Sequence, residues 1–168
     1  MIKSLSIVAA FAALILVQPA QAGELPAPTG PVILTITGKI ANTNAPGAAQ
    51  FDLAMLDALE QRTTITVTPW YEGEQSFAGP LLSAVLEAAG ADGTTLKVLA
   101  LNDYATDIPA DDATSYPVIL ASRLDGKELS VRDKGPLFVI YPFDLAPQLY
   151  NEVYFGRSAW QVKSIEVQ

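Results

Sequence analysis

The chain contains no cysteine, and it contains no histidine either. Without cysteine it cannot be held together by disulfide bonds, so a hydrophobic core must stabilise whatever fold it adopts. The two absences also limit its chemistry. Zinc sites built from His and Cys, cysteine nucleophiles, Ser-His-Asp triads and imidazole bases are all excluded. Any proton transfer would depend on Asp, Glu, Lys or Tyr side chains.

The first 22 residues have the pattern of a cleavable export signal. Lys3 gives a positively charged start, residues 5–17 form an apolar run, and Ala20-Gln21-Ala22 matches a small-residue cleavage site. The apolar run is shorter than the roughly 20 residues that span a bilayer. We therefore expect cleavage after Ala22, a mature protein in the periplasm or secreted, and no embedding in the membrane after cleavage.

The remaining part is acidic and long enough for one domain. Removing 22 of the 168 residues leaves 146, and the loss of Lys3 changes the formal net charge from −8 to −9. A chain of this length can bury a substantial core. Because an acidic domain repels phosphate backbones, we expect no nucleic acid among its partners.

Short β-favouring runs dominate the pattern. Residues 23–31 are rich in proline and glycine and predict an extended lead-in to a single domain over residues 32–168. β-Branched and apolar residues predict strands at residues 32–37, 63–68, 96–101, 104–109, 117–123, 127–131, 137–141 and 160–167. Asp125-Gly126 indicates a tight hairpin, and broken alternation after Trp160 allows a bulge in the last strand.

A few short helices are expected among these strands. The clearest covers residues 79–93, where Pro80 fits a first turn and Gly90 fits a C-terminal stop. Residues 51–62 predict a strand end passing into a short helix, and residues 146–156 another short helix. Residues 110–115 fit a turn or a helical segment. Together these elements predict an α+β fold of mixed β-structure with two or three short helices.

Two acidic stretches are candidate sites. Asp103, Asp107, Asp111 and Asp112 could bind calcium, but their spacing matches no EF-hand loop, so a solvated acidic edge is preferred. Glu72 and Glu74 follow Trp70-Tyr71 and could divide acid and base roles or border a sugar subsite. An exposed turn is the simpler interpretation of that pair.

A basic stretch, VRDKGP, places Arg132 and Lys134 on either side of Asp133, just before an apolar strand. Two cations at the end of a sheet can grip a carboxylate, sulfate or phosphate group. The alternative is local pairing with Asp133, which contributes little at a surface.

Four stretches of the chain have a characteristic order. SFAGPLLSAVLEAAG has an aromatic residue, Gly, Pro and Leu where a helix is expected to start, and VLALNDYATDIPADDA places Asp103-Tyr104 after a strand. PVILASRLDGKELSVRDKGPLFVIYP contains a hairpin, Gly-x-Pro-Leu and a strand, and AWQVKSIEV closes the chain. In this order they resemble the molybdopterin-binding domain of the sulfite oxidase family of oxidoreductases, from about Val32 to Val167. The resemblance implies a reduced version of that fold.

The departures from that family concern its cofactor site. The family holds molybdenum through a cysteine thiolate, at about the position where this chain has TVTPWYEGEQSF. The family's Asn-Arg pair after the cysteine is missing, and Phe138 and Ala159 replace an expected arginine and lysine. A thiolate is a strong soft ligand that hydroxyl groups do not replace. The resemblance therefore implies the fold without molybdenum chemistry, and we expect no cofactor, no metal site and no catalytic residues.

These observations predict an exported accessory or sensory binding module. Its partner would be a small anion, or a signalling or redox protein of the periplasm or membrane. The cations would hold the anion and aromatic rings would form walls. Trp70 would fill space that a pterin occupies in the family. The candidate ligand groove consists of Trp70, Asp103, Tyr104, Arg132, Lys134, Arg157 and Trp160.

Three other functions stay open. The first is an oxidoreductase that holds a molybdopterin-type cofactor without a cysteine ligand. The second is a cofactor-free hydrolase that uses Glu72, Glu74 or Asp103. The third is a structural subunit of a periplasmic complex.

Overall fold

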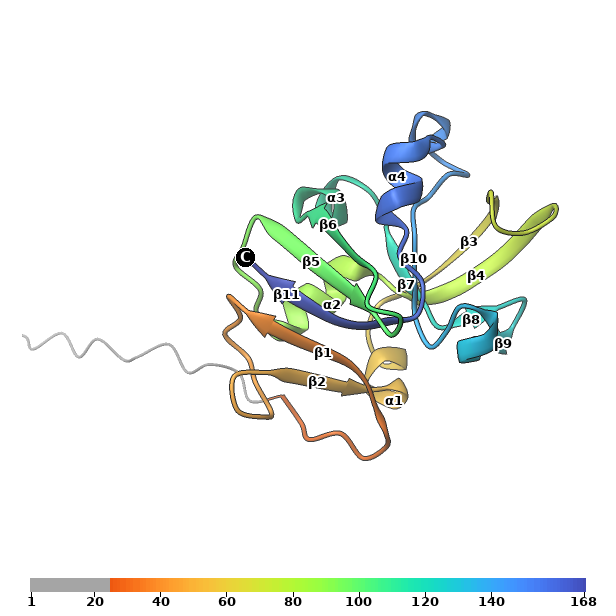
Figure 1. Ribbon diagram of the computed structural model, residues 1–168. Coiled ribbons are helices and arrows are strands. Elements are labelled where there is room, and N and C mark those ends of the chain that lie inside the picture. Colours follow the sequence, from red (N-terminus) through yellow and green to blue (C-terminus); the bar gives the residue numbers. More distant parts are fainter. Residues whose placement is uncertain (1–24) are drawn as a thin grey trace, which may run out of the picture.

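Eleven strands and four α-helices among residues 25–168 confirm the predicted α+β fold, here described from a computed structural model (Figure 1). The expected export signal and the first two residues of the lead-in lie outside this described range. The strands are β1 (Val32–Gly38), β2 (Ala49–Asp52), β3 (Gln61–Val67), β4 (Glu74–Pro80), β5 (Thr95–Ala100), β6 (Ala105–Pro109), β7 (Ile119–Ala121), β8 (Arg123–Leu124), β9 (Lys127–Glu128), β10 (Phe138–Ile140) and β11 (Val162–Val167).

The helices are short and lie between the strands. They are α1 (Leu53–Asp57), α2 (Leu82–Ala89), α3 (Asp111–Ser115) and α4 (Glu152–Arg157), with single 3₁₀ turns η1 (Val131–Asp133) and η2 (Pro147–Leu149). Residues 25–168 contain four α-helices, whereas two or three were expected, because the segment at residues 110–115, expected as a turn or a helix, is helical. Within residues 25–168, no helix has the length and apolar character needed to cross a membrane.

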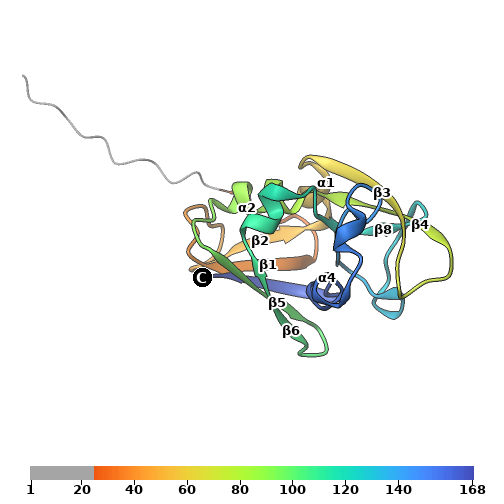
Figure 2. The same ribbon diagram turned by 90° about the horizontal axis from the view of Figure 1, so that it is seen from above.

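Three sheets make up the fold. The largest has the order β2-β1-β11-β5-β6, the second has the order β3-β4-β8-β9, and β10 pairs with β7 in the third. The last strand, β11, lies between β1, to which it is parallel, and β5, to which it is antiparallel. Its register shifts between Val162 and Ser164, which confirms the bulge. Helices α1 and α2 lie on one side of the largest sheet (Figure 2).

Two clusters of buried side chains form the core. The larger one lies between the five-stranded sheet and the helices and includes Leu34, Ile36, Leu82, Val98 and Ile165. The smaller one joins β4, β7 and β10 through Phe77, Ile119, Ala121, Phe138 and Ile140. Burial of this apolar area supplies the stability that disulfides cannot supply in a chain without cysteine.

The predicted helix at residues 79–93 is wrong at its N-terminal end. Gly79 and Pro80 end strand β4, where Pro80 lies opposite Gln61, and helix α2 begins only at Leu82. A Cβ on Gly79 would overlap the backbone carbonyl oxygen of Leu120, so glycine lets β4 pass close to β7. The stop at Gly90 is confirmed, because this residue has the left-handed φ of 62° that ends α2.

Asp52 connects the lead-in to the domain. Its carboxylate caps α1 by accepting from the backbone N–H of Met55 at 2.8 Å, and it also accepts from the N–H groups of Gly30 and Thr29, each at 2.7 Å. These bonds favour the charged form. The pKa of Asp52 is therefore lowered below its ordinary value of 3.8, chiefly by the Met55 and Gly30 bonds.

This lowered pKa predicts a specific loss of stability in acid. The stabilisation from Asp52 is complete above the unfolded pKa of 3.8 and is lost as the pH falls through the lower folded value. Asp52→Asn should therefore make the free energy of unfolding less dependent on pH in this acid range, as measured by urea denaturation. Asp107→Asn, on an exposed position of β6, is the control and should keep the wild-type pH dependence. If the free energy of unfolding of Asp52→Asn fell in acid as much as that of the wild type, the role given to Asp52 would be wrong.

Candidate functional site

Trp70 lies at the centre of an aromatic cluster. It follows β3, and its ring centroid lies 5.2 Å from that of Phe138, 5.9 Å from Phe155 and 6.0 Å from Trp160. These partners come from β10, α4 and the segment before β11, so the fold brings together residues far apart in the sequence. The Trp70 side chain is half-buried and contacts both core clusters.

Strand β3 and the residue that follows it point threonine side chains inward. Thr64, Thr66 and Thr68 are buried, whereas Ile65 and Val67 are exposed, which reverses the usual orientation of polar and apolar residues. Thr68 is 2% exposed, and its hydroxyl has no hydrogen-bond partner among the described residues. Such an unpaired buried hydroxyl is rare in folded proteins.

The turn that carries Arg132 and Lys134 lies against Tyr71, the neighbour of Trp70 in the chain. The Lys134 ammonium is 4.5 Å from the centroid of the Tyr71 ring, and the Tyr71 hydroxyl donates to the Asp133 carbonyl at 3.4 Å. The residue after Trp160, Gln161, donates its N–H to the Lys134 carbonyl at 2.9 Å. Burial, and secondly the Asp133 charge, raise the pKa of Tyr71, which therefore stays a neutral phenol near Lys134 at neutral pH.

Local pairing with Asp133 does not occupy these two cations. The Asp133 carboxylate accepts from the Ser130 hydroxyl at 2.7 Å instead. The ion pairs found among residues 25–168 include neither Arg132 nor Lys134. We name this region, made of Trp70, Tyr71, Arg132, Lys134 and Trp160, the cation–aromatic surface.

Asp103 and Tyr104 lie elsewhere, on the turn between β5 and β6. The Asp103 carboxylate pairs with Lys163 of β11 at 3.1 Å, and the Tyr104 hydroxyl donates to the Gly156 carbonyl of α4 at 2.8 Å. Both residues are exposed. These two contacts attach the turn to β11 and α4, and neither of them involves a residue of the cation–aromatic surface.

Arg157 belongs to a third place, a buried polar network. Its guanidinium donates to the Asp112 carboxylate at 2.9 Å, and the buried Tyr141 hydroxyl donates to the same oxygen at 2.7 Å. Asp112 is only 8% exposed, so the expected solvated edge is wrong for this residue, which α3 turns toward β10. Burial and the Asp112 contact raise the pKa of Tyr141 far above its ordinary value. The positive charge of Arg157 is therefore balanced by the Asp112 carboxylate.

The acidic stretches have no arrangement typical of a metal site. No group of three or more Asp, Glu, His or Cys side chains within residues 25–168 is placed to hold a metal ion. Glu72 lies on the connection between β3 and β4, and Glu74 is the first residue of β4. Both side chains are exposed.

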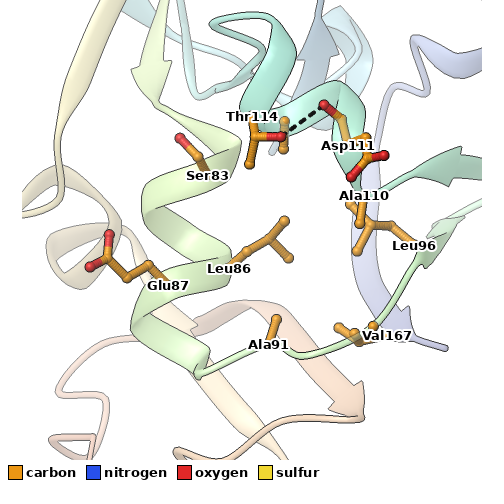
Figure 3. Close-up of a pocket in the computed structure, with 11 residues that line it drawn as sticks. Ser83, Leu86, Glu87, Ala91, Leu96, Ala110, Asp111, Thr114 and Val167 are labelled. Atoms are coloured by element: carbon orange, nitrogen blue, oxygen red, sulfur yellow. Dashed lines mark hydrogen bonds between the residues drawn. The ribbon is translucent and has the colours of Figure 1, made fainter.

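A pocket that the sequence did not predict lies between α2 and α3 (Figure 3). Its volume is about 450 Å³, with Leu86 and Leu96 among its apolar residues and Ser83, Glu87 and Asp111 among its polar ones. Because its charged residues are acidic, this pocket does not suit an anion. No sequence motif marks it, since its walls come from helices that meet only in the folded chain.

Comparisons with known proteins agree with this fold. Residues 48–167 match the family model of the oxidoreductase molybdopterin binding domain. Among solved structures, the crystal structure of the sulfane dehydrogenase SoxCD from Paracoccus pantotrophus superposes with a TM-score of 0.60 at 16% sequence identity. The match covers 80% of this chain and 37% of that one, so the chain spans little more than a third of the SoxCD chain. A search of curated proteins finds no match. The family model covers well over half of the chain, which therefore belongs to the oxidoreductase molybdopterin-binding domain family.

Proposed function

We propose that the chain is an exported accessory or sensory module that binds a small anion and has lost the molybdenum chemistry of its family. The observation that carries this proposal is the state of Arg132 and Lys134. Both belong to one short turn beside aromatic rings, and neither is paired with the carboxylate between them. Two uncommitted cations on an otherwise acidic chain are suited to a carboxylate, sulfate or phosphate group.

The chemistry of the available ligands supports the loss of the metal centre. The chain has no thiol or imidazole to offer a metal. In the segment where the family resemblance places a thiolate, Thr66 and Thr68 offer neutral hydroxyls that are 5% and 2% exposed, beside Pro69. A hydroxyl is a hard and weak donor compared with a thiolate. The side chains of this chain therefore do not fit a thiolate-held molybdenum centre.

The packing of Trp70 supports the same conclusion. Its indole ring contacts Phe138, Phe155 and Trp160 and lies beside the segment that replaces the family's ligand loop. Aromatic pairs with this spacing contribute about 0.5–1.5 kcal/mol each beyond their burial. Moving Trp70 aside for a pterin would break several such contacts, so we assign it the role of filling the former cofactor space.

The anion site predicts a loss of binding when both cations are removed. Arg132→Ala combined with Lys134→Ala should weaken binding of sulfate, phosphate or acetate at least about tenfold, because a hydrogen bond to a charged group contributes about 1.5–3 kcal/mol. Isothermal titration at low salt measures the affinity. The control combines Lys97→Ala with Lys127→Ala, which removes the same net charge from exposed positions on β5 and β9.

The two double variants separate a local site from general charge. Equal weakening in both would mean that the anions respond only to net charge. Unchanged affinity in the Arg132–Lys134 variant, or no binding of any of the three anions by the wild-type protein, would contradict the proposed site.

One alternative function has a specific observation behind it. Because residues 48–167 match the molybdopterin binding domain, the alternative is an oxidoreductase that holds a molybdopterin-type cofactor without a thiolate. In that case the buried Thr68 hydroxyl, which lacks a partner in the chain, would be available to a bound cofactor. Metal analysis of the natively exported protein separates this alternative from the anion-binding module.

A further inference from the structure

Among residues 25–168, the outer edge of β3 has no partner strand. β3 is the end strand of the sheet β3-β4-β8-β9 and pairs only with β4. The Leu81 N–H donates to the Glu60 carbonyl at 2.8 Å, just beyond the two strands, which makes this a hydrogen-bonded pair of the antiparallel ladder. Such pairs recur at every second residue. Arg62, Thr64 and Thr66 therefore bond to β4.

The intervening residues of β3 direct their backbone groups outward. On β4, the carbonyls of Ala78 and Ser76 accept from Ser122 and Asp125, on the side of β4 away from β3. Thr63 and Ile65 lie opposite these two residues, so their N–H and C=O groups point to the open edge. Val67 continues this alternation, so its carbonyl also points to the open edge. Among the described residues, that carbonyl accepts only a long hydrogen bond of 3.3 Å from the Thr66 hydroxyl.

This edge lacks the features that usually protect an edge strand. Its register with β4 is continuous from Gln61 to Val67, without a bulge, and these seven residues include no proline and no lysine. The single charge, Arg62, pairs with Asp144 at 3.0 Å. Ile65 and Val67 are 56% and 45% exposed. Natural proteins protect edges with bulges, prolines or charges, so an open apolar edge of this length indicates a partner.

A groove runs beside the edge and suits side chains of an added strand. It has a volume of about 570 Å³ and lies between β3 and the segment around η2. Ile65, Val67, Phe143, Pro147 and Tyr150 give it apolar walls, and Glu74 and Asp144 add carboxylates. Because Asp144 is paired with Arg62, Glu74 leaves the groove with a net negative charge.

We propose that an extended peptide segment of a partner protein adds to β3 as a new strand. Its backbone would bond to Thr63, Ile65 and Val67, and alternate apolar side chains would cover Ile65 and Val67. Lys or Arg at its ends would complement Glu74 and the acidic chain. A second copy of this chain is disfavoured as the occupant because both copies would carry the same net charge of −8. This docking edge is distinct from the cation–aromatic surface and does not depend on anion binding.

A designed peptide of matching chemistry tests this inference. The probe is a capped seven-residue peptide with Lys at both ends and alternating Val and Thr between them. Nuclear magnetic resonance of the wild-type protein should show its largest shift changes and slowed amide exchange at Thr63, Ile65 and Val67. A peptide with Glu at both ends should bind at least about tenfold more weakly, and N-methylation of alternate peptide amides should abolish binding, since strand addition needs those donors.

Protein variants provide the matched comparison. Ile65→Lys and Val67→Lys should each weaken peptide binding at least about tenfold by placing a charge on the edge. Val32→Lys alters a valine that is 43% exposed on β1 and should leave binding unchanged. Thermal melts show whether each variant folds. If Ile65→Lys or Val67→Lys does not fold, the remaining one of the two decides the result.

Several outcomes would overturn the inference. They are no binding of the Lys-flanked peptide, equal binding of the N-methylated peptide, or undiminished binding by a folded edge variant. A dimer of the wild-type protein that Ile65→Lys dissociates would also overturn it, because a second copy would then be the occupant. These outcomes do not depend on whether the Arg132–Lys134 variant loses anion binding.

Discussion

Replacing Asp112 with alanine is expected to lower the free energy of unfolding by about 3 kcal/mol, because it leaves the buried Tyr141 hydroxyl and the half-buried Arg157 guanidinium without their acceptor. Asp112 accepts from the Tyr141 hydroxyl at 2.7 Å and from the Arg157 guanidinium at 2.9 Å. The Tyr141 side chain is fully buried, so water cannot replace the lost bond. The contacts join α3, the residue that follows β10, and α4. Chemical denaturation measures the effect.

The neighbouring residue supplies the control for this prediction. Asp111→Ala removes an exposed carboxylate from the same short helix and should change the free energy of unfolding by less than about 0.5 kcal/mol. Tyr141→Phe should cost about 1 kcal/mol, since it removes one bond and retains the Arg157 pair. Equal losses in Asp112→Ala and Asp111→Ala would show that the buried network does not hold these elements together.

Phe138→Ala is expected to have the largest effect on stability, a loss of about 4 kcal/mol, because it opens a cavity at the centre of the aromatic cluster. Phe138 is fully buried, and its ring centroid lies 5.2 Å from Trp70, 6.0 Å from Trp160 and 6.1 Å from Phe77. Urea denaturation measures the loss. The fluorescence of the two tryptophans, which are the only ones in the chain, should shift to longer wavelength as water reaches them.

A more conservative change separates packing from fold disruption. Phe138→Leu keeps most of the buried volume and should cost clearly less than Phe138→Ala, with a smaller fluorescence shift. A Phe138→Ala variant with wild-type stability and unshifted fluorescence would contradict the view that these rings form one packed unit around Trp70.

Local signals in the sequence predicted much of the fold. The Asp125-Gly126 hairpin has positive φ values of 49° and 76° at its two central residues, as this dipeptide favours. The runs at residues 96–101 and 104–109 form β5 and β6, with bounds that differ by no more than one residue at either end. These elements were predictable because their own residues specify them.

Other elements depend on tertiary contacts and were missed. The stretch EQSFAGP has no strong β pattern, yet it forms β4, because β3 and β8 bond to both of its edges and Gly79 allows contact with β7. The predicted strand at residues 117–123 is divided between β7 and β8, which belong to different sheets. This pairing holds Gly79 and Pro80 in β4, so the predicted helix starts only at Leu82.

The sequence indicated which kinds of side chain could form a site, but it did not show which of them lie together. Trp70, Lys134 and Trp160 lie around one surface with Tyr71, which the prediction had not included. Arg157 carries a similar charge but pairs with Asp112, and nothing in the sequence marks that partner. Which cation stays unpaired is decided by the approach of distant elements, here α3 to α4.

We propose that this family member has exchanged its molybdenum centre for an aromatic core beside an anion site. The most direct test is elemental analysis, with absorption spectra, of wild-type protein purified from its own organism. We expect molybdenum far below one atom per chain and no pterin absorption. Molybdenum at one atom per chain, released together with a pterin on denaturation, would contradict it.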